Sequence, residues 1–148
     1  MTPTSTDAAV LGLRKQARAG LFVLATLQAF VSAWQYLFPR SFYDDFPTVR
    51  LDPPYNEHLV TDVGGLGLAL TAVLVMAAVR FDEKVARAAL TGYLIYAGTH
   101  FVFHVTHFDN FSLTQALAVG TGLGIEVVLA LLLLYVLRLL ARARGATG

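Results

Sequence analysis

The fold of this chain is decided by residues 85–107, VARAALTGYLIYAGTHFVFHVTH, in which a long apolar run ends in three histidines. The run is long enough for a membrane-spanning helix, because a bilayer core needs about 20 residues of helix. His100, His104 and His107 recur at helical spacing and therefore share one face of that helix. Ionisable side chains are costly in hydrocarbon and usually mark a function there. Chemistry is therefore expected at this end of the segment.

The composition of the whole chain is that of an integral membrane protein. Of its 148 residues, 56% are hydrophobic and 14% are charged, and the mean hydropathy is +0.61, which is too apolar for a soluble domain of this size. The formal net charge of +1 gives no reason to expect a nucleic-acid partner. The lack of cysteine excludes disulfides, thiolate metal sites and Cys-x-x-Cys redox pairs within the chain. We expect a multi-pass protein of the inner (plasma) membrane.

Four segments are expected to cross the lipid bilayer, at residues 19–38, 57–79, 85–107 and 113–140. A loop of residues 39–56 and two short turns connect them, so neighbouring spans run antiparallel. The sequence thus predicts an all-α fold in which residues 1–148 form a single antiparallel four-helix transmembrane bundle. The N-terminal segment also resembles a signal peptide, but its apolar run is longer than is typical of such signals, which favours a retained helix.

The distribution of charge predicts the orientation of this bundle. Nine of the eleven basic residues precede the first span, flank the turn near residues 80–87 or follow the last span. Only Arg40 and Arg50 lie on the opposite side, which also carries four acids. These acids are Asp44, Asp45, Asp52 and Asp109. Because Lys and Arg concentrate in cytoplasmic loops, both termini are expected in the cytoplasm and the loop of residues 39–56 outside.

A second polar set opens the span at residues 57–79, in the same layer of the membrane as the three histidines. His58 and Asp62 are one helical turn apart and share a face, whereas Glu57 points elsewhere. Imidazoles and a carboxylate at matched depth on antiparallel helices suit a divalent transition metal such as zinc, copper or iron. The predicted metal ligands are His58, Asp62, His100 and His104.

Two other interpretations of the same residues stay open, because His-x-x-x-His-x-x-His lacks the glutamate of the His-Glu-x-x-His protease signature. In the first, neutral imidazoles form an interfacial hydrogen-bond network with Asp62 and backbone carbonyls. In the second, His58 and either His100 or His104 hold a haem. Gly64, Gly65, Gly67 and Gly98 would leave room for the haem, although closer helix packing is the commoner role of such glycines.

Glu126 is the deepest acid of the last predicted span, and Gln28 lies at a similar depth on the first. A proton relay and a polar anchor for a ligand are possible roles, but a hydrogen bond that joins two helices is the commoner one. His107, which is nearer to water, is either a further metal ligand or a proton shuttle. The candidate catalytic residues are Glu57, His107 and Glu126.

Residues 42–47 (FYDDFP) and 54–64 (PYNEHLVTDVG) resemble small, uncharacterised four-span integral membrane proteins of actinobacteria. The overall layout is also similar to the broad DoxX-like group, which includes small membrane subunits associated with quinone or thiol oxidation. These resemblances imply four spans, but they imply no established activity and carry over no catalytic residue.

Two classes of function follow from the sequence. The first is a membrane metalloenzyme or oxidoreductase, whose metal in the His/Asp cluster acts on a lipid-soluble substrate. The second is a non-catalytic small membrane subunit that binds a quinone, a haem or a larger complex. Gly120 and Gly124 form a Gly-x-x-x-Gly face that suits close helix approach, either within the bundle or in a homo-oligomer.

Overall fold

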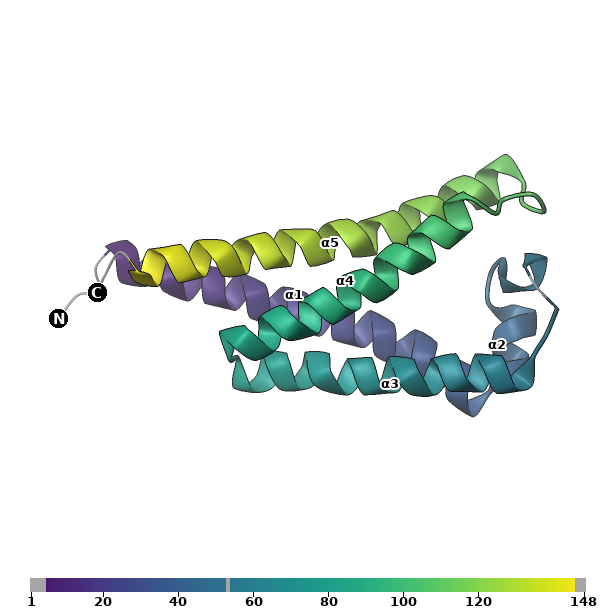
Figure 1. Cartoon of the computed structure of the whole chain (residues 1–148), viewed down its shortest axis with the longest axis horizontal. Helices are drawn as coiled ribbons and strands as arrows, with labels where there is room; N and C mark the ends of the chain where they lie inside the picture. The colour runs from purple at the N-terminus through teal and green to yellow at the C-terminus, as the bar shows by residue number, and fades with distance from the viewer. Residues whose placement is uncertain (1–4, 53, 146–148) are drawn as a thin grey trace.

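A computed structural model describes residues 5–52 and 54–145, and all regular structure in those ranges is helical. The helices are α1 (Ser5–Leu37), α2 (Pro39–Asp45), α3 (Glu57–Arg80), α4 (Glu83–Val105) and α5 (Leu113–Gly145), with a short 3₁₀ helix η1 (Val49–Leu51) between α2 and α3. The four long helices form an elongated antiparallel bundle (Figure 1). The prediction of an all-α fold is confirmed.

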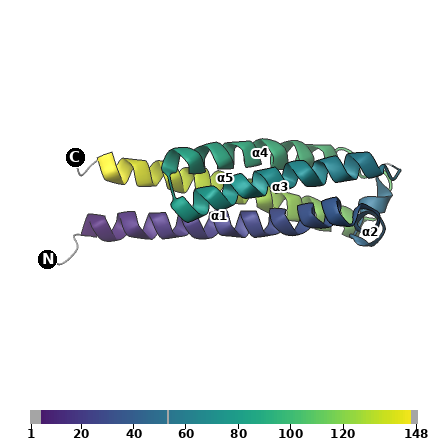
Figure 2. The same cartoon turned by 90° about the horizontal axis from the view of Figure 1, so that it is seen from below.

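The two ends of the bundle differ in composition, and we name them accordingly. The basic end holds the start of α1, the α3–α4 turn and the end of α5, while the loop end holds α2, η1 and the α4–α5 turn (Figure 1). Helix α2 lies across the loop end rather than along the bundle (Figures 1 and 2). Asn56 caps α3, since its side-chain Oδ1 accepts a hydrogen bond from the backbone N–H of Leu59 at 3.1 Å.

Three helices are long and apolar enough to cross a membrane, namely residues 7–37 of α1, all of α3 and all of α5. Helix α4 is not among these three, because tyrosines and histidines interrupt its hydrophobic run. It nevertheless packs along α5 within the same bundle. The structure therefore supports a membrane protein, with three of the four predicted spans recognisable by length and composition.

The hydrophobic core lies in the half of the bundle nearer the basic end. Leu21, Leu24, Leu74, Leu90 and Leu137 are fully buried there, and they come from all four long helices. Large apolar side chains elsewhere point outward on every long helix, as expected for surfaces that face lipid rather than water. Packing is therefore tightest at the basic end.

Glycines bring α1 and α3 into close contact in the other half of the bundle. A Cβ atom at Gly64 would lie 2.6 Å from the backbone nitrogen of Tyr36 and 2.9 Å from the Cβ of Gln35. Gly67 faces Ser32 with equally little space. These glycines thus serve helix packing, which is the commoner of the two roles considered for them, and they leave no room for a macrocycle.

Helices α3 and α4 diverge from the turn that joins them. At the basic end they are adjacent, but α4 crosses toward α5 at the loop end while α3 stays beside α1 (Figure 1). The loop between α1 and α3 is folded against α1, where the indole of Trp34 donates to Ser41 Oγ at 3.2 Å and packs on Phe42 and Phe46. The bundle therefore consists, at its loop end, of an α1/α3 pair and an α4/α5 pair.

Candidate functional site

The four predicted metal ligands are divided between the two helix pairs. His58 and Asp62 contact each other on α3, with Nε2 and Oδ2 3.3 Å apart, and their side chains are 86% and 59% exposed. His100 and His104 lie on α4 with ring centroids 4.9 Å apart. At the loop end α4 has crossed toward α5 and away from α3 (Figure 1), and these four side chains form no group that could hold a metal ion.

The prediction of a zinc, copper or iron cofactor is wrong. In residues 5–52 and 54–145, no group of three or more His, Cys, Asp and Glu side chains could hold a metal ion. Depth and helix face place His58 and His100 in one layer, but they say nothing about the divergence of α3 and α4. A haem between His58 and a histidine of α4 is not supported either, because α3 and α4 diverge at this level (Figure 1). Nothing supports a bound quinone.

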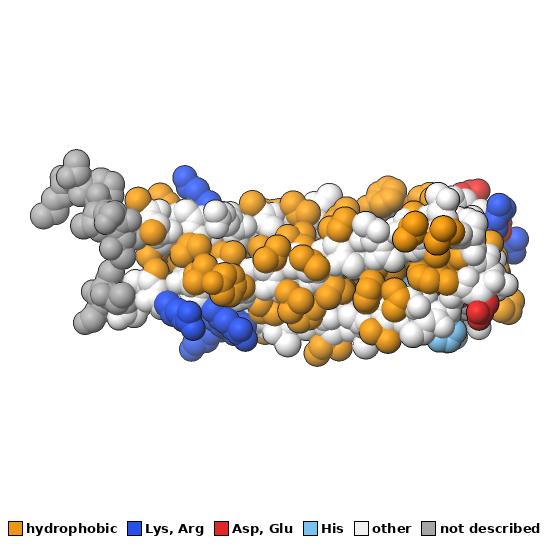
Figure 3. Space-filling view, turned by 90° about the horizontal axis from the view of Figure 1, so that it is seen from above, with side chains coloured by type: hydrophobic (Ala, Val, Ile, Leu, Met, Phe, Trp, Pro, Cys, Tyr) orange, Lys and Arg blue, Asp and Glu red, His pale blue; other side chains and the backbone are white. Residues whose placement is uncertain are grey.

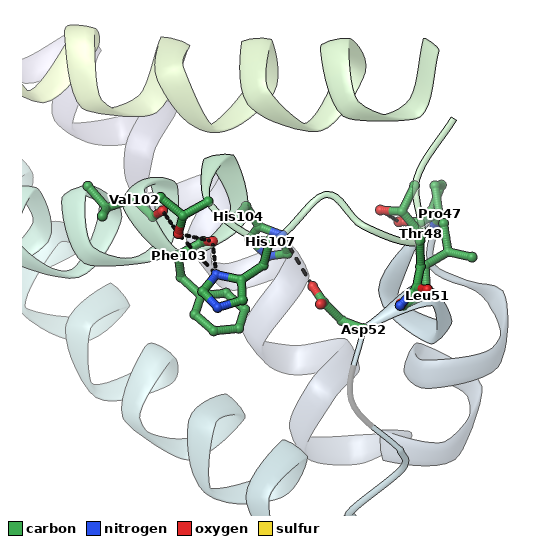
Figure 4. Close-up of polar contacts among 10 residues, drawn as sticks. Pro47, Thr48, Leu51, Asp52, Val102, Phe103, His104 and His107 are labelled. Carbon is green, nitrogen blue, oxygen red and sulfur yellow. Dashed lines mark hydrogen bonds and ion pairs between the residues drawn. The ribbon is translucent and has the colours of Figure 1, made fainter. Parts of the chain in front are cut away.

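His104 has a different acidic partner, which the sequence did not reveal. Its Nδ1 lies 3.3 Å from Oδ2 of Asp52, which follows η1 in the loop, and both side chains are largely buried, at 17% and 18% exposure (Figure 4). The two atoms are at ion-pair distance without hydrogen-bond alignment, so Nδ1 has no hydrogen-bond partner among the described residues. Asp52 belongs to an irregular segment, where helical periodicity predicts no neighbours.

A second contact joins the same loop to the α4–α5 turn. The side-chain amide of Asn110 donates to the carbonyl oxygen of Leu51 at 3.1 Å. Together with the approach of Asp52 to His104, this hydrogen bond ties the segment around η1 to the α4/α5 pair. The same segment continues into α3, so the loop bridges both helix pairs where they diverge.

The candidate catalytic residues His107 and Glu57 are exposed, and the described contacts of His107 are with residues close to it in the sequence. His107 stacks on Phe103 with ring centroids 4.4 Å apart, and its Nδ1 lies 2.8 Å from the carbonyl oxygen of Phe103 and 3.0 Å from Thr106 Oγ1. Its ring is turned away from the contact between His104 and Asp52 (Figure 4). Glu57 is exposed in the first turn of α3. Their catalytic roles stay predictions.

Glu126 bonds to a tyrosine of α4, whereas Gln28 bonds to a serine of its own helix. The hydroxyl of Tyr93 donates to Glu126 Oε2 at 3.0 Å, and Tyr93 is fully buried. The amide of Gln28 donates to Ser32 Oγ at 2.8 Å, within α1. The interhelical polar bonding expected of Glu126 thus exists, with Tyr93 as its partner.

One face of α4 connects these deep groups to the loop end. Successive rings along this face are separated by 6.3 Å between Tyr93 and Tyr96, 5.8 Å between Tyr96 and His100, and 4.9 Å between His100 and His104, measured between centroids. Every member of the series is buried or half-buried. We call the following set the polar row: Asp52, His104, His100, Tyr96, Tyr93 and Glu126.

The polar row opens toward the loop end and is closed toward the basic end. Beyond Tyr93, the buried face of α4 continues with Leu90, Ala89 and Ala86, and that of α5 continues beyond Glu126 with Ala130 and Leu133. These side chains can neither donate nor accept a proton. The row therefore reaches from the loop end to the middle of the bundle and stops there.

The side chains of the polar row are suited to passing protons. Imidazole and phenol can each donate one hydrogen bond while accepting another, and a carboxyl group can take up or release a proton. Imidazole is also the side chain that changes charge most readily near neutral pH. Groups of this kind within a membrane bundle are typical of proton relays.

Comparisons of this chain with protein-family models, with curated proteins and with solved structures found no match. The resemblances to small four-span proteins of actinobacteria and to the DoxX-like group therefore stay predictions. The polar row and the distribution of charge are the features on which a function can be argued.

Proposed function

We propose that this chain is a small integral membrane subunit that carries protons between the water at its loop end and Glu126 in the membrane interior. The observation that carries this proposal is the polar row, in which four ring side chains on one face of α4 join Asp52 to Glu126. The proposal belongs to the class of non-catalytic small membrane subunits, and it requires no metal or other cofactor.

We further infer that all four long helices cross the membrane with the basic end in the cytoplasm. Lys and Arg side chains are visible toward the basic end, where acids are not seen, whereas the loop end shows acids and a histidine together with some Lys or Arg (Figure 3). This asymmetry follows the positive-inside rule. Helix α4 packs beside α5, and the rings of the polar row on α4 are buried or half-buried, although α4 is less apolar than α3 and α5.

A proton from outside first meets Asp52 and His104, which lie close together near the interface. It then passes to His100 and onward through the hydroxyl groups of Tyr96 and Tyr93. Each hydroxyl accepts one proton and releases another, so each is restored, and the net change is one proton gained by the Glu126 carboxylate. Where the polar atoms of successive rings are too far apart for a direct hydrogen bond, an ordered water molecule would bridge them.

Because the core beyond Glu126 is apolar, the path reaches only the middle of the membrane and does not cross it as a channel would. We call it a half-path. A proton on Glu126 must therefore return along the row or leave sideways from α5, where neighbouring Ile125 is 61% exposed. A second membrane protein or a lipid-soluble substrate beside α5 is the natural recipient. For this reason we assign the chain the role of a subunit within a larger assembly.

Labelling with a hydrophobic carbodiimide tests the half-path, because this reagent adds to protonated carboxyl groups within membranes. We expect modification of Glu126 at a rate that falls as the pH on the loop side rises and does not change with the pH on the basic side. Right-side-out and inverted vesicles, followed by peptide mass analysis, separate the two dependences. Glu126→Gln must abolish the label, and a rate that follows the pH of the basic side would contradict the proposal.

The orientation has a clean test, because the chain contains no cysteine to interfere. Arg50→Cys at the loop end should react with a membrane-impermeant maleimide on intact cells, since Arg50 is exposed. Lys15→Cys, exposed on α1 toward the basic end, should react only after the membrane is permeabilised. The reverse pattern would show that the loop end faces the cytoplasm.

A further inference from the structure

The α3–α4 turn brings two arginines of α1 against neutral groups. The guanidinium carbon of Arg14 lies 5.2 Å from the centroid of the Phe81 ring, and Arg18 Nε donates to the carbonyl oxygen of Ala78 at 3.0 Å. Phe81 ends α3 in a left-handed conformation, with φ 41°, and is only 6% exposed. An aromatic face and a carbonyl thus position both cations while leaving their charges uncompensated at these contacts.

Two more cations and two acids flank the same turn. Arg80 and Lys84 are exposed on either side of Phe81. The carboxylate of Asp82 accepts hydrogen bonds from the backbone N–H groups of Lys84 and Val85 at 2.8 and 3.0 Å, which caps α4. These bonds and the nearby charge of Lys84 lower the pKa of Asp82, whose single negative charge leaves the cations around Phe81 in excess.

The second acid of the turn, Glu83, pairs with Arg144 at the end of α5. It is therefore not available to neutralise the cations around Phe81. Arg14, Arg18, Arg80 and Lys84 together form a basic cluster drawn from three helices, which we call the turn cluster. The turn cluster therefore places positive charge at the basic end of the bundle, next to the apolar surfaces of the long helices.

We propose that the turn cluster binds the headgroup of an anionic phospholipid in the leaflet that faces the basic end. Guanidinium groups match phosphate oxygens in geometry and charge, and basic pockets between helices at this depth suit anionic headgroups. Met76 and Val79, in the last turns of α3, are 45% and 57% exposed, which offers apolar surface to an acyl chain. This combination of charge and adjoining apolar surface favours a lipid over free phosphate.

Native mass spectrometry of the purified full-length chain tests this site with defined lipids. The chain is supplied with equal amounts of phosphatidylglycerol and phosphatidylcholine, and the retained lipid is identified by mass. We expect preferential retention of phosphatidylglycerol, and a loss of about tenfold or more in that retention for Arg14→Gln/Arg18→Gln, because each basic residue near an anionic surface contributes to lipid attraction. Equal retention of the two lipids by the unmodified chain would overturn the proposal.

Two further variants separate lipid binding from folding and from total charge. Arg80→Gln/Lys84→Gln leaves the contacts of Arg14 and Arg18 intact and should also reduce retention. Lys15→Gln/Arg50→Gln removes the same number of charges away from Phe81 and should retain phosphatidylglycerol normally. An equal loss in this control, or complete displacement of the lipid by millimolar inorganic phosphate, would contradict a lipid site. The proposal is independent of the polar row, so neither result bears on proton transfer.

Discussion

Gly64→Ala is expected to lower the free energy of unfolding by about 1–3 kcal/mol, the range typical of overpacked interfaces. The added methyl group would lie 2.6 Å from the backbone nitrogen of Tyr36 and 3.0 Å from the backbone carbonyl carbon of Gln35. A backbone cannot move aside as the end of a flexible side chain can. The whole of α3 must therefore shift away from α1 near this point, and other contacts between the two helices weaken with it.

Titration with a denaturing detergent, followed by loss of helicity, measures this effect. Gly65→Ala is the matched control, because it makes the same change one residue along α3, where the new methyl group would lie 3.8 Å from the Tyr36 ring. Alanine also favours helix over glycine by about 1 kcal/mol. The control should therefore be neutral or stabilising, and an equal loss of stability in both variants would show that α1 and α3 do not pack as described.

His100→Leu is expected to slow the response of Glu126 to a change of pH on the loop side by about 100-fold, the lower end of what a positioned proton-transfer group contributes. Leucine nearly fills the space of the imidazole but can neither accept nor donate a proton. It interrupts the polar row between Tyr96 and His104, whose rings adjoin that of His100 at 5.8 and 4.9 Å. The measurement is the rate at which carbodiimide labelling of Glu126 adjusts after an external pH jump.

His58→Leu is the matched control for this variant. It removes an imidazole at the same end of the bundle, but His58 is exposed on α3 and contacts Asp62 rather than the polar row. We expect it to leave the response of Glu126 unchanged. If His58→Leu slowed labelling as much as His100→Leu, proton entry would have to follow α3, and the path along α4 would be wrong.

Much of the fold could be predicted from the sequence, because long apolar runs and helix caps act locally. Asn56 marks the start of α3, and the short turn near Phe81 requires α3 and α4 to be antiparallel. The depth of Glu126 also indicated that it needs a polar partner within the bundle. Each of these inferences uses residues that are close in sequence or a property of the membrane itself.

The partners of the polar side chains could not be predicted in the same way. Helical phase says which face carries His100, but not which helix lies opposite that face. The close packing at Gly64 and Gly67 holds α3 on α1, so α4 meets α5 and the loop instead. The spacing of Tyr93, Tyr96, His100 and His104 was a usable signal, since these residues recur at intervals of three and four and thus share one face.

The segment around η1 connects the two helix pairs at the loop end. It holds the α4/α5 pair through Asp52 and Asn110 and continues directly into the α1/α3 pair, which spreads away at the same level. A change in the tilt of either pair therefore alters the gap between Asp52 and His104, which is the mouth of the half-path. Because a span longer than the local bilayer accommodates by tilting, we expect a change of bilayer thickness to act on the entrance of the proposed proton path.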